Sequence, residues 1–284
     1  MKREALYSLL DEYLAALLNR APERVRWATG ARTSENNVML KIGEGLWGTI
    51  DEIGDYRLLF ADQQENQVGY FGTLREGPEE SAFTLRLKVN EDGAIEEAET
   101  LIVRQIDSGI KFEPQHFDDK PILNSLAKGQ GTREDMIALS DGYFSTLQQN
   151  DGTLHTRFHP ECNRVENGVQ TTNNPDFAVV PVAALDCESQ FRMGVYRYDD
   201  RLRSRRYPLV DLERGLVLAF AFIDHSGRIR EYQLTDGRTV RSPLARPHSF
   251  YLAELFRIED GMLRQIEANF ITVPYYMPSP WNGE

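Results

Sequence analysis

The histidines are the side chains of this sequence best suited to moving protons. His159 stands in the stretch "RFHPECNR", and His225 ends the apolar stretch "LAFAFIDH". Imidazole titrates near neutral pH, so a histidine in a cleft can act as a general acid or base. Asp224 could set the tautomer of the adjacent His225, although neighbouring residues of a strand face opposite ways. We take His159 and His225 as candidate catalytic residues, with a surface or structural histidine as the alternative for each.

Two aspartates at matching places in the chain are further candidates for proton transfer. Asp62 follows "LLFA", and Asp211 follows "PLV". An ion pair could also explain Asp211, which lies close in sequence to Arg206 and Glu213. Arg192 joins the catalytic candidates, because a guanidinium group can hold an anion or a phenolate beside the acid and the base.

Aromatic side chains could line an apolar pocket around these groups. Alternating strands need large inward-facing residues, so most of the aromatic residues are expected in the core. The candidates that we retain for substrate binding are Arg32, Trp47, Tyr56 and Tyr70 in the first half and Tyr196, Phe222 and Tyr275 in the second. A buried tyrosine hydroxyl needs a hydrogen-bond partner, and a substrate can provide one.

The stretches "RTSENN" and "CNRVENGVQTTNN" combine arginine, glutamate and asparagine within a few residues. Arg164 could hold an anion, and Glu166 could take a proton if it is partly removed from water. Asn-Gly and Asn-Asn sequences favour turns, however, and the pattern occurs in both halves of the chain. We therefore expect a structural rather than a catalytic role for these stretches.

The sequence has no pattern typical of a metal or cofactor site. The cysteines and histidines lack the spacing of zinc ligands, and the glycine-rich stretches match neither a phosphate-binding loop nor a dinucleotide-binding turn. We expect a reaction that uses no metal and no cofactor. Cys162 and Cys187 are the only cysteines, and in a chain with no export signal we expect two free thiols rather than a disulfide.

Charge and hydropathy argue against two classes of partner. The chain has 284 residues and a formal net charge of −12, with no basic stripe, so we do not expect it to bind nucleic acid. No apolar run approaches the length that crosses a membrane, and the polar amphipathic N-terminus does not resemble a secretory signal. These features predict a soluble, cytoplasmic protein.

An internal repeat organises the elements that must position the candidate residues. "REALYSLLDEYLAALLNR" from Arg3 and "REDMIALSDGYFSTLQQN" from Arg133 agree at several positions, and both have apolar residues at helical spacing. Three further pairs recur in the same order: "SENN" with "VENG", "LLFADQQENQVGYFG" with "PLVDLERGLVLAFAF", and "FTLRLKVNEDGAIEEAET" with "FYLAELFRIEDGMLRQIEAN". The repeat indicates a duplicated domain whose second copy carries insertions, the largest around residues 174–206.

Each copy opens with one long helix and continues as strands. Alternating apolar and polar residues predict strands over 68–74, 82–89 and 95–105 in the first copy and over 215–224, 249–258 and 262–273 in the second. "NEDG" and "EDG" are expected to be hairpin turns. The sequence therefore predicts an α+β fold of two tandem cone-shaped rolls, each a long helix packed in a curved antiparallel sheet, that form a pseudo-dimer. The glycine-rich connector at 124–132 places the domains at 1–125 and 126–284.

The chain resembles the SnoaL-like, nuclear-transport-factor-2-like superfamily. The resemblance covers nearly the whole chain and rests on "TSENN…GEGLW" and "FAD…VGYFG" in the first half and on "CNRVENGVQTT", "RRYPLVDLERGLVLAFAFIDH", "AELFRIEDG" and "VPYYMPSPW" in the second. Within the superfamily it is similar to two-domain diarylpropane lyases of sphingomonads. This resemblance implies a cofactor-free lyase that converts a lignin-derived diaryl propanediol, through a quinone methide, into a stilbene and formaldehyde.

Two other functions stay open from the sequence. One is another SnoaL-type enzyme, such as a dehydratase, isomerase, cyclase or epoxide hydrolase, and the other is a non-catalytic protein that binds small molecules. The first half could form a pocket with Trp47, Tyr56, Asp62 and Tyr70, and the second with His159, Arg192, Tyr196, Asp211 and His225. The histidines and the insertions favour the second half, or the seam between the halves. The expected partner is a small aromatic substrate, and the sequence is compatible with a monomer or a homodimer.

Overall fold

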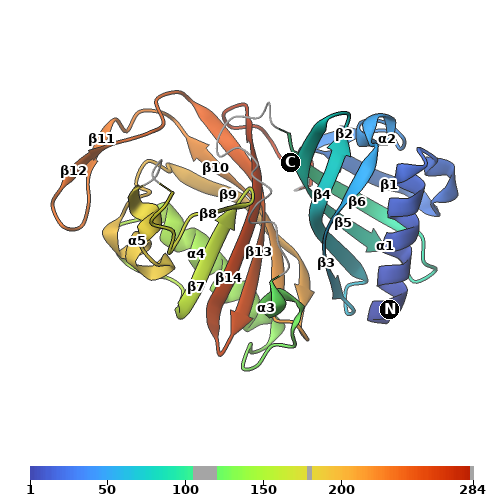
Figure 1. Ribbon diagram of the computed structural model, residues 1–284, viewed down its shortest axis with the longest axis horizontal. Helices are drawn as coiled ribbons and strands as arrows, with labels where there is room; N and C mark the ends of the chain where they lie inside the picture. Colours follow the sequence, from blue (N-terminus) through green and yellow to red (C-terminus); the bar gives the residue numbers. More distant parts are fainter. Residues whose placement is uncertain (105–119, 178–180, 282–284) are drawn as a thin grey trace.

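Two curved sheets, each with a helix in its concave face, make up the structure (Figure 1). The computed structural model describes residues 1–104, 120–177 and 181–281. The first half contains α1 (Arg3–Leu18), η1 (Pro22–Arg24), β1 (Trp27–Glu35), β2 (Val38–Leu40), α2 (Leu46–Thr49), β3 (Glu52–Asp62), β4 (Gln67–Glu76), β5 (Glu79–Val89) and β6 (Ile95–Val103).

The second half repeats this series and adds to it. It contains α3 (Pro121–Asn124), α4 (Arg133–Gln149), β7 (Phe158–Glu166), β8 (Val169–Gln170), η3 (Pro181–Ala184), α5 (Cys187–Met193), β9 (Arg201–Asp211), β10 (Leu216–His225), β11 (Glu231–Gln233), β12 (Thr239–Arg241), β13 (His248–Glu259) and β14 (Met262–Val273). The predicted strands and both hairpin turns are confirmed, apart from Gln105, which lies outside the described residues.

The two sheets have the same topology. Their strand orders are β2-β1-β6-β5-β4-β3 and β8-β7-β14-β13-β10-β9, so each strand of the first sheet has a counterpart at the same place in the second. One pair in each sheet, β1 with β6 and β7 with β14, is parallel, and the other neighbouring strands are antiparallel. The predicted duplication is therefore confirmed, while the domain limits at 125 and 126 stay a prediction.

Both long helices form where the sequence predicts them. The buried face of α1 consists of Leu6, Leu10, Tyr13, Leu14, Ala16 and Leu17, which recur at three- and four-residue steps. A capping box starts α4: the Thr132 hydroxyl accepts from the Asp135 amide at 3.2 Å, and the Asp135 carboxylate accepts from the Thr132 amide at 3.0 Å. Neither helix, nor any other described one, is long and apolar enough to cross a membrane.

Insertions distinguish the second half. Between β8 and β9 the chain forms η3 and α5, in the region where the largest insertion is predicted, and between β10 and β13 it forms the β11–β12 hairpin. Figure 1 shows this hairpin extending outward from the second sheet, with α5 below it at the end of the cone. Cys162 and Cys187 are both buried and free, as expected.

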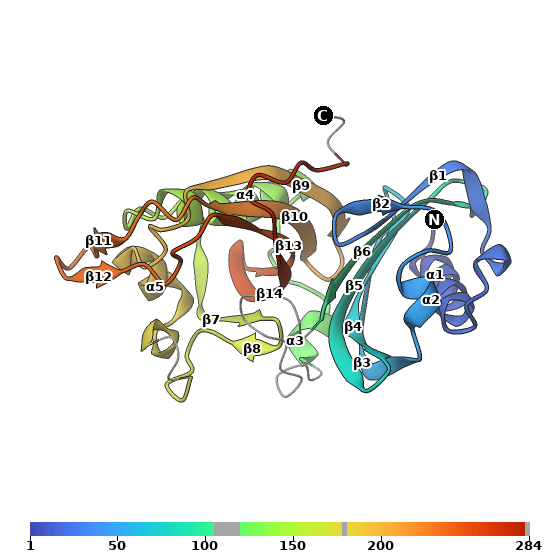
Figure 2. The ribbon, with the colours of Figure 1, turned by 90° about the horizontal axis from the view of Figure 1, so that it is seen from above.

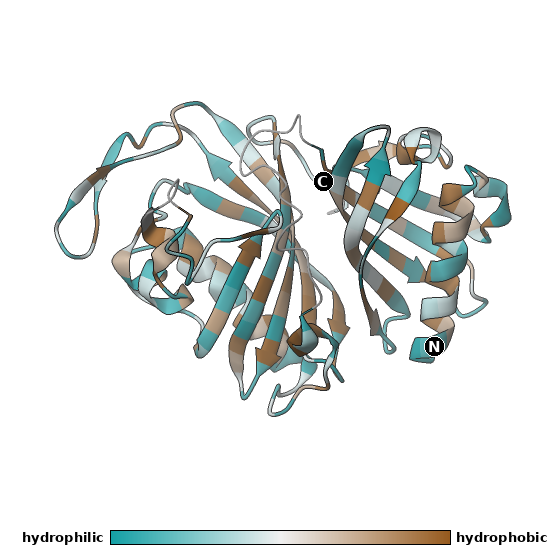
Figure 3. Cartoon of the chain, in the orientation of Figure 1, coloured by the Kyte–Doolittle hydropathy of each residue, from teal (hydrophilic) through white to brown (hydrophobic). Residues whose placement is uncertain are grey.

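The outer faces of the two sheets pack against each other at a seam. Figure 2 shows the first sheet curving away from the second, and Figure 3 shows apolar residues alternating with polar ones along the strands of both. One buried cluster joins the halves and includes Leu58, Phe60, Phe71 and Leu101 from the first and Leu209, Phe220, Tyr251 and Leu255 from the second. The halves therefore share a core, as the predicted pseudo-dimer requires.

Asp62 and Asp211 lie at this seam in reciprocal positions. Asp211 accepts from Arg3 at 2.5 Å and from the Ala61 amide at 3.0 Å. Asp62 pairs with Arg133 at 2.7 Å and accepts from the Val210 amide at 2.9 Å. Each carboxylate thus receives an arginine from a long helix and a backbone amide, across the pseudo-twofold relation. This placement does not support the predicted catalytic roles of Asp62 and Asp211, because both groups are buried and already paired.

Candidate active site

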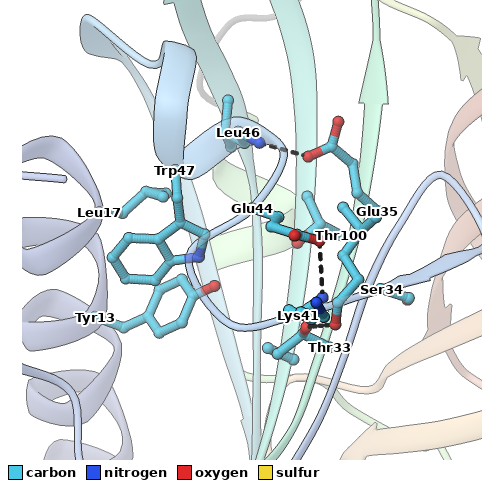
Figure 4. Close-up of a pocket in the computed structure, with 12 residues that line it drawn as sticks. Tyr13, Leu17, Thr33, Ser34, Glu35, Lys41, Glu44, Leu46, Trp47 and Thr100 are labelled. Carbon is cyan, nitrogen blue, oxygen red and sulfur yellow. Dashed lines mark hydrogen bonds between the residues drawn. The ribbon is translucent and has the colours of Figure 1, made fainter. Parts of the chain in front are cut away.

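The first cone is filled by its own side chains. Trp47 from α2 packs against Tyr13 of α1, with ring centroids 5.4 Å apart, and Leu17 covers the same place (Figure 4). Glu35 accepts from the amide of Leu46 at 2.7 Å and so holds α2 over the end of the cone. The space that is left measures about 20 Å³, which is room for a single water molecule.

The second cone encloses a cavity of about 340 Å³. Its wall consists of Tyr143, Leu147, Arg164, Glu166, Thr171, Tyr196, Tyr198, Asp199, Ile223, His225, Pro243, Leu244, Phe250, Leu252, Glu254, Ala268 and Phe270. Leu147, Ile223, Phe250 and Leu252 are apolar, and the polar residues gather in two places. A cavity of this size, with an apolar wall and a few polar groups, is typical of a site for a small organic ligand.

The first polar group, which we call the histidine centre, consists of His225 and Asp199. His225 ends β10 and is 1% exposed, and Asp199 is 6% exposed. The Nδ1 atom of His225 lies 3.2 Å from Oδ1 of Asp199, within ion-pair distance, although the angle does not meet hydrogen-bond geometry. Among the described residues, neither ring nitrogen of His225 has a hydrogen-bond partner.

Burial raises the pKa of Asp199, and the neighbouring His225 opposes that shift. Asp224 does not set the tautomer of His225: it lies on the other face of β10, where it accepts from Arg203 at 2.9 Å and from Ser249 at 2.5 Å. Because neighbouring residues of a strand face opposite sides, His225 lies beside Asp199, whereas Asp224 contacts Arg203 and Ser249.

The second polar group, which we call the arginine centre, consists of Arg164, Glu166, Glu254, Tyr143 and Tyr196. Arg164 on β7 is 2% exposed. Its guanidinium lies 3.4 Å from Glu166, 3.5 Å from the Tyr143 hydroxyl, and donates to the Tyr196 hydroxyl. Glu254 lines the cavity beside this group, and the Tyr143 hydroxyl acts to lower the pKa of its carboxyl. Two acids, two phenols and one cation therefore meet inside the cone.

The two carboxyl groups of this centre differ in their surroundings. Glu254 lies on β13 and is 4% exposed. Burial, helped by the charge of Glu166, raises its pKa to about 8, against the effect of Arg164. At neutral pH Glu254 is therefore mostly protonated and can donate a hydrogen bond or a proton. Glu166, a quarter exposed and next to Arg164, is an acceptor. Two neighbouring acids that differ in burial in this way are typical of acid–base sites.

The phenols of the arginine centre stay protonated at neutral pH. Burial raises the pKa of Tyr196 to about 12, although Arg164 acts in the opposite direction. Burial also raises the pKa of Tyr143 well above its usual range. Both hydroxyls are thus hydrogen-bonding groups rather than bases.

Two of the predicted site residues, His225 and Tyr196, line the cavity. Trp47 and Tyr70 fill the first cone, and Phe222 belongs to the seam core. His159 accepts from the Glu161 amide at 3.1 Å near the surface, and Arg192 pairs with Glu188 at 2.6 Å along the exposed side of α5. The structure does not bring these five residues to the cavity.

The other three predicted substrate-binding residues also lie elsewhere. Arg32 is exposed and stacks on Trp281, with its guanidinium carbon 4.5 Å from the ring centroid. Tyr56 is half-buried beside the seam core, and Tyr275 is 42% exposed on the C-terminal tail. The tail crosses the seam, where Asn37 donates to the Pro278 carbonyl at 2.8 Å. None of these three residues lines the cavity.

The expected structural role of "CNRVENGVQTTNN" covers its turn but not the residues before it. The turn is present, with Asn167 at a φ of 50° and Gly168 at 78°. Arg164 and Glu166 precede the turn on β7, however, and line the cavity together with Thr171. Their equivalents in the first cone are Thr33 and Glu35, by strand register. The turn is the same in both halves, but the strand before it differs, with Arg164 in the second half where the first half has Thr33.

Sequence reasoning missed Glu254, Asp199 and Tyr143 altogether. Glu254 carried a signal, because "FYLAELF" alternates along a strand and puts this acid in line with Phe250 and Leu252. A carboxyl on the apolar face of a strand is costly unless it has a function or a partner. Asp199 and Tyr143 gave no comparable signal, since one lies in a loop and the other has a tyrosine equivalent in the filled cone.

The geometry supports proton transfer on a bound organic molecule. The histidine centre supplies a base with a carboxylate beside it, and the arginine centre supplies a cation, a protonated acid and two phenols. In the described part of the chain, no cluster of His, Cys, Asp and Glu residues is arranged to hold a metal ion.

Comparisons with known proteins give one family match. The family model described as "Domain of unknown function (DUF8021)" matches residues 129–270. No curated protein matches the chain.

Several solved structures are similar to part of the chain. A de novo designed protein with a curved β-sheet is 18% identical and has a TM-score of 0.31, covering 36% of this chain and 88% of that one. A candidate ketosteroid isomerase from Kribbella flavida is 16% identical, with a TM-score of 0.30 and coverage of 41% and 90%. A steroid delta-isomerase from Pseudomonas aeruginosa is 14% identical, with a TM-score of 0.28 and coverage of 34% and 79%.

Proposed function

We propose that this protein, which belongs to the DUF8021 family, is an enzyme that acts in its second cone. The whole lining of the cavity lies within the matched residues 129–270. It moves protons on a small aromatic substrate and needs no cofactor. The reaction that we assign to it is elimination from a diaryl propanediol, in accord with the sequence resemblance.

The observation that carries this proposal is the setting of His225. A buried imidazole whose nitrogens make no hydrogen bond to any described residue is costly in an apolar wall unless a ligand completes its hydrogen bonds. Asp199 at 3.2 Å from Nδ1 favours the tautomer with its proton on that atom. The Nε2 atom is then left as a base, and Asp199 stabilises the imidazolium that forms when Nε2 takes a proton.

The arginine centre has the complementary role of stabilising negative charge on the substrate. A phenol oxygen placed here can lose its proton to Glu166 and receive hydrogen bonds from Arg164. Glu254 is mostly protonated at neutral pH and can give its proton to a leaving hydroxyl. The sites for acid and base are thus separate, so each can keep its protonation state.

The elimination balances without an oxidant or reductant. The benzylic carbon–oxygen bond breaks, and the hydroxyl leaves as water with a proton from Glu254, giving a quinone methide whose electrons come from the phenolate. His225 then takes the proton of the terminal hydroxyl, the carbon–carbon bond to that group breaks, and its electrons restore the phenolate. The products are one stilbene, one formaldehyde and one water.

A second candidate, isomerisation of an unsaturated ketone, is favoured by one observation. Glu254, mostly protonated at neutral pH, and the Tyr143 hydroxyl both line the cavity, and two such groups can donate to the oxygen of an enolate. His225 or Glu166 would move the carbon-bound proton. In this reaction no formaldehyde forms, so product analysis separates the two candidates.

The test is incubation of the purified protein with a diaryl propanediol that carries a free phenol. We expect stilbene and formaldehyde in equal amounts, and turnover in the His225→Ala variant that is lower by roughly two to four powers of ten. The matched control is His159→Ala, whose imidazole lies outside the cavity and whose turnover should equal that of the wild type. Equal loss in both variants, or wild-type turnover in His225→Ala, would remove His225 from the mechanism.

Exchange of the proton next to the carbonyl of an unsaturated ketone, with no aldehyde released from the diol, would favour the isomerase. Binding of either compound with no turnover would leave a binding protein and contradict both enzymatic proposals.

A further inference from the structure

Gln190 is a completely buried residue that touches the arginine centre without lining the cavity. It lies on α5, the helix that the second half has where the first half has α2, and its side chain is 0% exposed. Its amide nitrogen donates to the carbonyl of Thr171 at 2.7 Å and to that of Val182 at 2.9 Å. Both N–H groups are therefore used on backbone carbonyls, and this fixes which way the amide points.

The carbonyl oxygen of Gln190 accepts two hydrogen bonds on its other side. Arg164 donates to it at 2.7 Å, and the Tyr196 hydroxyl donates to it at 2.5 Å. Because Tyr196 has a single hydroxyl proton, that proton points at Gln190 and away from the cavity. Arg164 in turn donates to the oxygen of Tyr196. Gln190, Arg164 and Tyr196 are thus joined pairwise by three hydrogen bonds, which we call the Gln190 triangle.

This triangle decides what the arginine centre can offer a ligand. The Nη2 and Nε atoms of Arg164 are engaged with Gln190, Tyr196 and Thr171, at 3.1 Å for the last. Among the residues that the structure describes, its Nη1 atom has one long contact, 3.5 Å to the Tyr143 hydroxyl. The donors of Arg164 left for a ligand are therefore on Nη1, and the Tyr196 hydroxyl has no proton left to donate to it.

We propose that Gln190 is a positioning residue of the active site, which orients Arg164 and the Tyr196 hydroxyl without contacting the ligand. The inference rests on the proposed function of the second cone. It gives the inserted helix α5 a role in that site, because Gln190 lies on α5 and contacts Arg164. Without the carbonyl of Gln190, the Tyr196 hydroxyl is free to rotate, and Arg164 loses a hydrogen bond that fixes the orientation of its guanidinium group.

A double-mutant cycle on ligand affinity tests this role. The probe is trans-4-hydroxystilbene, whose binding is followed by fluorescence, so that the outcome does not depend on turnover. We expect Gln190→Met to weaken binding about tenfold in the wild type, the cost of a hydrogen bond to a charged group. In the Tyr196→Phe background the same change should cost clearly less, about three- to fivefold, because Tyr196, one of the two partners that Gln190 orients, is gone while Arg164 remains.

Gln190→Glu separates positioning from support of α5. It keeps an acceptor for Arg164 and Tyr196 but removes the donors to Thr171 and Val182, so we expect near wild-type affinity with a lower midpoint of thermal unfolding. If Gln190→Met costs the full tenfold in the Tyr196→Phe background, or Gln190→Glu weakens binding as much as Gln190→Met, Gln190 only supports the helix and the proposal is wrong.

Titration of Tyr196 gives a second readout that a merely structural role does not move. With fluorotyrosine at position 196, its pKa can be followed by fluorine NMR in the folded protein. The carbonyl of Gln190 stabilises the protonated phenol, so Gln190→Met should lower the pKa of Tyr196. An unchanged or raised pKa in a folded Gln190→Met protein would contradict the proposal, whether or not the protein releases formaldehyde.

Discussion

The two cones have the same strands in the same order, yet one is filled and the other is open. A row of paired residues crosses the first sheet through Glu35, Thr100, Leu85 and Tyr70. The corresponding row of the second sheet is Glu166, Ala268, Glu254 and Ala219. A tyrosine and a threonine are thus alanines in the second sheet, and a leucine is a buried acid. The same row of the second sheet therefore has smaller side chains, which leave room for the cavity, and an additional acid that lines it.

The element that closes each cone differs as well. In the first half α2 inserts Trp47 between Tyr13 and Leu17, whereas in the second half the longer insertion forms α5 and brings Gln190 to Arg164. A duplicated domain can thus keep one copy as a packed support and use the other for chemistry. The comparison teaches that the site depends on a few inward residues and one insertion rather than on the fold.

The largest effect should come from emptying the filled cone. Trp47→Ala should lower the free energy of unfolding by about 3–5 kcal/mol, since it removes a large buried ring. Phe250→Ala in the open cone should cost less, because Phe250 borders the cavity and has fewer packing partners on that side. Urea unfolding of both variants measures the difference. Equal costs would mean that the second cone is as densely filled as the first.

The next largest effect should come from filling the open cone. Ala268→Phe places a ring in the cavity, so the affinity for trans-4-hydroxystilbene should fall about 100-fold or more, a loss of about 2.7 kcal/mol. Thr100→Val, in the same row of the first sheet, is the matched control and should leave the affinity unchanged. Unchanged binding in a folded Ala268→Phe protein would place the ligand elsewhere.

A smaller, pH-dependent effect should follow from Glu254. Its pKa is raised in the folded protein to about 8, so folding favours the protonated form. Stability from this group is complete below the pKa of an unfolded glutamate and is lost as the pH rises through about 8. Glu254→Gln removes this loss, so at pH 9 the variant should be more stable than the wild type, on the order of 2 kcal/mol. Thermal unfolding from pH 5 to 9 tests it.

The same group should shape the pH dependence of catalysis. If Glu254 is the general acid, kcat/KM should decline above a pH of about 8 as the carboxyl ionises. Glu254→Gln should remove this alkaline limb and lower the plateau. An alkaline limb that persists in the variant would assign it to another group.

Much of the fold could be predicted from the sequence, because it depends on periodicities. The helix starting at Arg133 and the strand 262–273 follow from apolar spacing, and the repeat places the insertions. The open cone could not be predicted, since Trp47 and Tyr196 are both aromatic. Only their placement in the fold makes Trp47 fill the first cone and Tyr196 line the cavity of the second. His225 was found by its chemistry, while its partner Asp199 lies far along the chain and is brought close by folding.

The reciprocal aspartates show the opposite error. Asp62 and Asp211 occupy equivalent strand ends, which suggested matching catalytic roles. Their equivalence instead reflects the seam between the halves. There each aspartate pairs with the first arginine of the long helix of the other half. Symmetry between copies is therefore a sign of packing, and departure from symmetry, as at Glu254 and Ala268, is the better guide to function.

The most direct test of this account is a crystal structure of the protein soaked with trans-4-hydroxystilbene. We predict one ligand in the second cone, with its phenol oxygen within hydrogen-bond distance of Nη1 of Arg164 and its other ring toward His225. We also predict no ligand in the first cone, where Trp47 leaves no room. A ligand seated in the first cone or at the seam, with the second cone empty, would contradict the account.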